Sequence, residues 1–148
     1  MPTVSAGAAQ AWFTAGTIPL ILAGGAHALL ALRDTVRPRS FAPIERSVKP
    51  AIEDTGIRLV GKAAPSMWRV WLGINITFGL GLFSFGLVCL LIATHDFKLV
   101  EEIDAIRPLT IAFSAALFAV SLRFFFYGPV IITGVATTCF TIATVLSL

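Results

Sequence analysis

Long apolar segments separated by short polar ones dominate the pattern along the chain. Residues 11–32, 70–93 and 124–148 contain no Asp, Glu, Lys or Arg, and these runs are 22, 24 and 25 residues long. A helix needs about 20 predominantly apolar residues to cross a hydrocarbon core of roughly 30 Å. Each run is therefore long enough to form a transmembrane helix.

A fourth helix follows from the length of the last apolar region. Residues 109–148 carry one charge, at Arg123, and as a single helix they would extend about 60 Å, twice the thickness of the core. Gly128 and Pro129 provide a break, because glycine is permissive and proline fits the first turn of a new helix. We expect an all-α integral membrane four-helix bundle that forms a single membrane domain over residues 1–148. The expected helices are about residues 11–32, 68–93, 108–126 and 129–148.

Composition supports a membrane protein. Hydrophobic residues make up 57% of the chain and charged residues 13%, whereas soluble domains contain about 25% charged residues. Residues 1–10 contain no Lys or Arg, and the first apolar run exceeds the roughly 7 to 15 residues of a signal-peptide core. We therefore expect the first run to be a retained helix.

Basic residues are concentrated on one predicted side of the membrane. Loop 94–107 contains only Lys98 and Arg107, whereas the turn before the last helix contains Arg123 and the first loop is strongly basic. The positive-inside rule then places the first loop in the cytoplasm of a bacterial-type inner membrane, with both termini on the other side. The basic residues of the first loop and its borders are Arg33, Arg37, Arg39, Arg46, Lys49, Arg58, Lys62 and Arg69.

The two larger loops differ in character. In the cytoplasmic loop, residues 33–67, the apolar residues Ile44, Val48 and Ile52 recur every four positions, a spacing typical of a short amphipathic helix on a membrane surface. This loop is either a charged connector that rests on its own helix ends or a docking surface for anionic lipid or a soluble partner. The outer loop, residues 94–107, is acidic, and we expect it to be solvated.

Polar residues within the predicted helices are the candidate functional residues, because polar groups are costly in hydrocarbon. His27 lies six residues before Arg33, and Asn75 lies six residues after Arg69. Each is therefore about 9 Å along its helix from a border residue, so the two share a depth. The candidate ligand-binding residues of one polar layer are His27, Asn75, Ser121, Arg123 and Thr133.

Several roles are open for these residues. A neutral His27 can hydrogen-bond Asn75 and fix helix packing, bind a ligand or lipid headgroup, transfer protons or ligate haem. The other histidine, His95, is predicted on the opposite side of the membrane, so a second haem ligand would come from another chain. Arg123 is expected to snorkel to the headgroups.

Small residues recur every four positions on two helices. Such stripes permit close approach of membrane helices, and we expect them to pack the bundle internally, with oligomerisation as the alternative. Threonine hydroxyls also bond back to their own helix, so this stripe need not line a path. The predicted helix-packing residues are Gly73, Thr77, Gly81, Thr133, Thr137 and Thr141.

Motifs for catalysis or metal binding are missing from the sequence. It contains no zinc-ligand spacing, Walker loop, nucleophile elbow or dinucleotide fingerprint, and Cys89 and Cys139 lie at different depths, so we expect free thiols. The four predicted helices contain no Asp or Glu, which disfavours an ion-coupled transporter. We predict no catalytic residue, no metal and no cofactor.

Three features of the sequence are Gly24-Gly25-Ala26-His27 in the first helix, Trp68 and Trp71 at the start of the second, and Tyr127-Gly128-Pro129 before the last. In these features the chain resembles small bacterial four-helix inner-membrane proteins of unassigned function. The leading hypothesis is a non-catalytic accessory or structural subunit of a membrane assembly. Its expected partners are membrane lipids and like or unlike membrane subunits, and we expect no binding to nucleic acid. One alternative is a small protein that binds or transports a lipid, quinone or amphiphile through the layer around His27 and Asn75. Another is a haem or redox membrane subunit.

Overall fold

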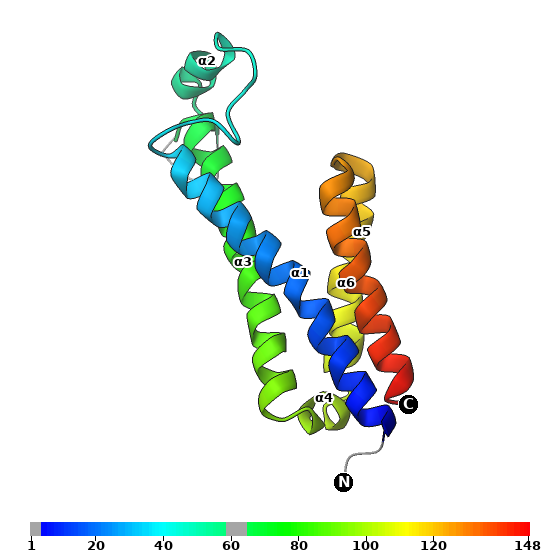
Figure 1. Ribbon diagram of the computed structural model, residues 1–148. Coiled ribbons are helices and arrows are strands. Elements are labelled where there is room, and N and C mark those ends of the chain that lie inside the picture. Colours follow the sequence, from blue (N-terminus) through cyan, green and yellow to red (C-terminus); the bar gives the residue numbers. More distant parts are fainter. Residues whose placement is uncertain (1–3, 59–64) are drawn as a thin grey trace. The chain divides into compact units, whose positions relative to one another are not determined.

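The computed structural model describes residues 4–58 and 65–148 of the chain. Lys62 of the basic loop lies outside these ranges. Within them the only β-type pairing is an isolated antiparallel bridge between Gly56 and Ser66, and the rest of the regular structure is helical (Figure 1). The helices are α1 (Val4–Asp34), α2 (Val48–Asp54), α3 (Met67–His95), α4 (Lys98–Glu102), α5 (Ile106–Phe124) and α6 (Tyr127–Leu146).

Four of these helices are long and apolar enough to cross a membrane, which confirms the prediction from hydropathy. Their candidate spans are Gly7–Asp34, Met67–His95, Ile106–Phe124 and Tyr127–Leu146. The helices α5 and α6 contain 19 and 20 residues, or about 29 and 30 Å, close to the thickness of a hydrocarbon core. In contrast, α1 and α3 contain 31 and 29 residues and so extend beyond the core or tilt within it.

The break between α5 and α6 lies slightly earlier than predicted. Phe125 and Phe126 have extended backbones, and the new helix begins at Tyr127 instead of position 129. Pro129 therefore occupies the first turn of α6, where the missing amide hydrogen costs no hydrogen bond within the helix.

The chain divides into two compact units, and α1 and α3 each continue from one into the other. Unit 1 consists of Met1–Ala23 and Leu82–Leu148, and unit 2 consists of Gly24–Gly81.

Unit 1 contains an apolar core formed by buried residues of α1, α3, α4 and α6, against which partly buried residues of α5 pack. Phe13 of α1 lies at its centre, with its ring edge-on to Phe140 at 5.1 Å and to Phe97 at 6.0 Å. Two glycines allow close packing: a Cβ at Gly86 would lie 2.9 Å from a side-chain carbon of Ile21, and one at Gly16 would lie 3.1 Å from Phe140. The buried core residues are Phe13, Leu20, Leu82, Cys89, Ala93, Val100, Ala136, Phe140 and Ala143.

Polar contacts also tie the helix ends of unit 1 together. The Gln10 amide donates to the carbonyl of Ala93 at 2.7 Å, which joins α1 to α3. Arg107, at the start of α5, donates to the carbonyl and hydroxyl of Ser147, each at 3.3 Å. Because these partners are distant in sequence, the bonds fix the ends of α1 and α6 within the unit.

Unit 2 is a pair formed by the second half of α1 and the first half of α3, with the connecting loop and α2. Ala28 and Leu72 are among its buried apolar residues. The helices approach most closely at Gly79, where a Cβ would lie 2.5 Å from the backbone nitrogen of Ala28. The helix α2 falls where the spacing of Val48 and Ile52 predicted a short helical piece.

Close packing on α3 uses a different face from the predicted one. Gly73, Thr77 and Gly81 are exposed, and a Cβ at either glycine would meet nothing within 4 Å. The stripe therefore does not supply the close contacts between α3 and α1, which come from Gly79 and Gly86, and packing of the stripe against other helices of the chain stays a prediction. The oligomerisation alternative stays a prediction.

The burial of the threonine stripe of α6 decreases along the helix. Thr133 is buried, Thr137 is half-buried and Thr141 is exposed, since a spacing of four residues drifts around a helix with 3.6 residues per turn. Their hydroxyls donate to the carbonyls four residues earlier at 2.7, 2.8 and 2.8 Å. The hydroxyls are thus satisfied within α6 itself.

Candidate functional site

His27 and Asn75, predicted to share a depth, are hydrogen-bonded in unit 2. Nε2 of His27 lies 3.1 Å from Oδ1 of Asn75, while Nδ2 of Asn75 donates to the carbonyl of Trp71 at 2.8 Å. Because the amide oxygen can only accept, His27 Nε2 must be the donor. A neutral imidazole then keeps its lone pair on Nδ1.

The His27 ring also packs between two phenylalanine rings. Its centre lies 4.8 Å from that of Phe41 and 5.3 Å from that of Phe78, both in edge-on geometry. Phe78 belongs to α3, whereas Phe41 comes from the loop after α1. The loop therefore folds back over the His27 side chain.

Phe41 is held in place by two backbone hydrogen bonds. Its N–H donates to Oδ2 of Asp34 at 2.7 Å, and its carbonyl accepts from the Trp71 indole N–H at 3.1 Å. The backbone carbonyl of Trp71 in turn accepts from the Asn75 side chain. Because His27 contacts both Asn75 and Phe41, these contacts form a closed circuit. We call this circuit the Phe41 clasp; its members are His27, Asp34, Phe41, Trp71 and Asn75.

Asp34 is the most deeply buried member of the clasp. Its exposed fraction is 0%, and among the described residues its second carboxylate oxygen, Oδ1, has no hydrogen-bond partner. An acidic residue at the C-terminal end of a helix opposes the helix dipole. This unfavourable position is the one signal in the sequence that Asp34 makes a specific contact. Both Asp34 and Phe41 were missed in the sequence analysis.

The other three candidate residues belong to unit 1. Ser121 and Thr133 are buried, and the Thr133 hydroxyl donates to the carbonyl of Pro129 at 2.7 Å. Arg123 is exposed, with its guanidinium 5.5 Å from the centre of the Phe124 ring. The structure therefore joins His27 to Asn75 and places Ser121, Arg123 and Thr133 in the α5–α6 hairpin.

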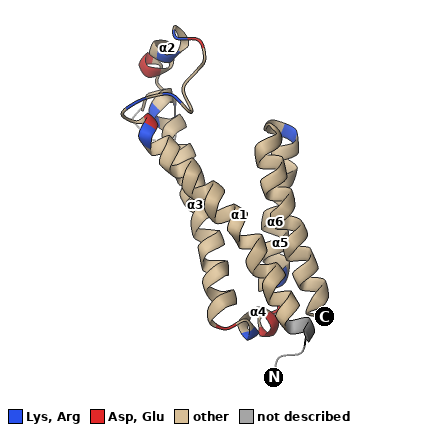
Figure 2. Ribbon diagram, in the orientation of Figure 1, with Lys and Arg blue, Asp and Glu red and all other residues tan. Residues whose placement is uncertain are grey.

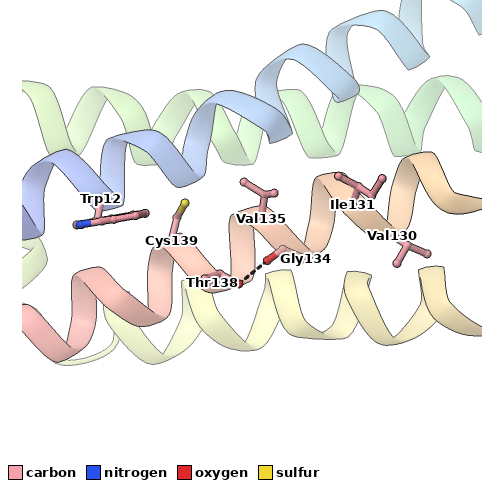
Figure 3. A pocket seen from close by; sticks show the side chains of 7 residues that line it. All are labelled: Trp12, Val130, Ile131, Gly134, Val135, Thr138 and Cys139. Carbon is pink, nitrogen blue, oxygen red and sulfur yellow. Dashed lines mark hydrogen bonds between the residues drawn. The ribbon is translucent and has the colours of Figure 1, made fainter.

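Two pockets in unit 1 are apolar and do not include the polar pair. The first has a volume of about 360 Å³ and lies between Trp12 of α1 and one side of α6 (Figure 3). Its one hydroxyl, on Thr138, donates to the carbonyl of Gly134 at 2.9 Å. The second, of about 430 Å³, is lined by α1 alone, from Gly7 to Ile18. Neither pocket offers a charged side chain to a ligand.

Groups suited to metal binding do not gather in the described residues. No cluster of three or more His, Cys, Asp or Glu side chains occurs there, and Cys89 and Cys139 are free and buried, as predicted. A haem at His27 would have to use Nδ1, because Nε2 is bonded to Asn75.

No protein-family model, curated protein or solved structure matches the chain. The Phe41 clasp contains one carboxylate and one imidazole, but the carboxylate is bonded to a backbone amide and the imidazole to a side-chain amide. These contacts hold the loop against the helices, which is a structural task.

Proposed function

We propose that the protein is a non-catalytic accessory or structural subunit of a membrane assembly and that it packs against a like or unlike chain through one face of α3. The observation that carries this proposal is the exposed stripe of Gly73, Thr77 and Gly81. A Cβ at either glycine would meet nothing within 4 Å, so close contacts within unit 2 do not account for their small size. Small residues on a membrane helix allow the backbone of a second helix to approach.

The use of the polar residues supports this proposal. His27 and Asn75 bond to each other, and the threonines of α6 bond to their own helix. The first bond joins α1 to α3, and the others satisfy the hydroxyls within α6, as expected of helices whose polar groups serve structure and not chemistry.

Mass measurement on gently solubilised protein tests the proposed interface. The variant Gly73→Leu/Gly81→Leu places two bulky side chains on the exposed stripe, and Gly7→Leu is the matched control, because a Cβ at Gly7 also meets nothing within 4 Å. We expect the wild type and the control to run as an assembly and the double variant to run as a monomer. A wild-type protein that is a strict monomer without co-purifying protein would contradict the proposal.

The two alternatives have less support. A lipid-, quinone- or amphiphile-binding protein would need a cavity beside His27 and Asn75, whereas the two pockets lie elsewhere. A haem or redox subunit would need Nδ1 of His27 and a second ligand from another chain. The absorbance spectrum of the purified protein tests for haem directly.

We also propose that the basic loop faces the cytoplasm of a bacterial-type inner membrane and that both termini lie outside. Support comes from the charge distribution, with the Lys and Arg residues of unit 2 in and around one loop (Figure 2). Single cysteines at Ser40 and Asp104, both exposed, can be introduced after Cys89 and Cys139 are replaced by alanine. A membrane-impermeant maleimide should label Asp104→Cys in intact cells and Ser40→Cys only after lysis. The reverse pattern would refute this orientation.

A further inference from the structure

Unit 2 presents an uncompensated basic surface. Residues 24–81 contain eight of the eleven basic residues of the chain and four of its eight acidic residues. Three of the basic residues, Arg33, Arg37 and Arg39, follow one another closely at the end of α1, and all are exposed. The ion pair found in the described part of unit 2 joins Lys49 to Glu53 instead, so these three arginines have no carboxylate partner there.

The segment that carries them is folded. At the end of α1 the amides of Val36 and Arg37 both donate to the carbonyl of Arg33, at 3.0 and 2.9 Å. Asp34 and Trp71 then bind the backbone of Phe41 from both sides. Residues 33–41 thus form a closed turn, which we call the arginine turn.

The only acidic residue of the arginine turn does not reach its surface. Asp34 is fully buried, and its Oδ2 accepts from the Phe41 amide. The exposed side chains of the turn therefore include three cations and no anion. A guanidinium presents a planar fork of donors that matches two oxygens of a phosphate.

The location of the turn indicates the source of the phosphate. The candidate membrane span of α1 ends at Asp34, so the arginine turn begins where the apolar segment ends and headgroups are expected. Val36, between the arginines, is 81% exposed, and Trp71 beside the turn is 46% exposed. Exposed apolar and indole groups next to arginines suit the boundary between hydrocarbon and headgroups. A soluble acidic partner would not account for the exposed Val36.

We propose that the arginine turn is a preorganised binding site for the phosphate groups of anionic phospholipids. The proposal does not depend on the assembly proposed above, since it concerns the end of α1 and not the exposed face of α3. It differs from a general attraction of a basic loop to an anionic membrane, because the fold of the turn, and not only its charge, determines the affinity.

Spin-labelled lipids in phosphatidylcholine nanodiscs test the proposal. We expect the wild type to associate more strongly with spin-labelled phosphatidylglycerol than with spin-labelled phosphatidylcholine. The variant Arg33→Gln/Arg37→Gln/Arg39→Gln should lower this preference at least about fivefold, the factor that corresponds to the roughly 1 kcal/mol contributed by one basic residue near an anionic surface. Equal association of the wild type with both lipids would overturn the proposal.

A matched control separates the site from the charge of the loop. Arg46, Arg58 and Arg69 are also exposed and lie in unit 2 but outside the arginine turn. Changing these three to glutamine removes the same charge, and we expect most of the lipid preference to remain. If this control loses as much preference as the first variant, total charge explains the binding and the proposed site is wrong.

Two further variants test the folded turn itself. Trp71→Phe removes the indole N–H that binds the Phe41 carbonyl without changing the charge. Asp34→Ala removes the acceptor of the Phe41 N–H together with a negative charge. Both should weaken the phosphatidylglycerol preference, although electrostatics alone predicts no change for the first and a stronger preference for the second. Unchanged preference in Trp71→Phe would contradict the proposal, and this variant keeps the test valid even if Asp34→Ala fails to fold.

Discussion

Replacing Gly79 by alanine perturbs the closest contact between α1 and α3 in unit 2. The added Cβ would lie 2.5 Å from the backbone nitrogen of Ala28 and 2.9 Å from its Cα. Backbone atoms of a helix cannot rotate away as a flexible side chain can, so the two helices must separate. Overpacking of this kind costs about 1 to 3 kcal/mol.

A second alanine variant on the same helix isolates that steric cost. At Gly73 the added Cβ meets nothing within 4 Å, so Gly73→Ala has no steric cost within the chain. Both variants gain the same helix propensity, about 1 kcal/mol for a change from glycine to alanine. The difference in unfolding free energy between the two variants therefore equals the steric term, and we expect Gly79→Ala to be the less stable by about 1 to 3 kcal/mol.

The assay is unfolding in mixed micelles of increasing denaturing-detergent fraction, followed by circular dichroism. Monomeric conditions are needed, because Gly73 belongs to the proposed interface with another chain. If Gly79→Ala proves as stable as Gly73→Ala, then α1 and α3 do not approach each other at Gly79 and the described packing of unit 2 is refuted.

Two other substitutions test the core and the polar pair by the same assay. Phe13→Ala should lower the unfolding free energy by about 3 to 5 kcal/mol, because the Phe13 ring is buried between Phe97 and Phe140. The control Phe126→Ala, at a 74% exposed position, should change it by less than about 0.5 kcal/mol. Equal effects of the two variants would place Phe13 outside the core. Asn75→Leu leaves the His27 Nε2–H without its acceptor. It should cost about 0.6 kcal/mol and at most about 1.7 kcal/mol, the average and the maximum for polar contacts between membrane helices; no loss of stability would mean that the bond does not form.

The four helices were predictable because their signal is local. Hydropathy and length identify a span without knowledge of its neighbours, and the separation of α5 from α6 followed from the fact that 40 residues exceed one span. The shared depth of His27 and Asn75 could also be counted along the sequence, because rise per residue is fixed in a helix. Whether the two side chains face each other depends on the rotation of both helices, which counting does not give.

The Phe41 clasp and the packing face of α3 were not predictable in the same way. Phe41 reaches His27 only because the loop folds back through Asp34 and Trp71, contacts that span up to 30 residues of sequence. On α3, the spacing of four residues predicted close contacts at Gly73 and Gly81. The close contact with α1 lies at Gly79 instead, which packs against the backbone of Ala28. A small-residue pattern indicates close approach without saying which face approaches which helix.

The most direct test of the proposed role is the protein content of native lipid particles extracted from the membrane without detergent. The account predicts that each particle contains this chain together with further copies or with another membrane protein, and that the Gly73→Leu/Gly81→Leu variant is recovered alone. Particles that contain a single wild-type chain and no other protein would contradict it.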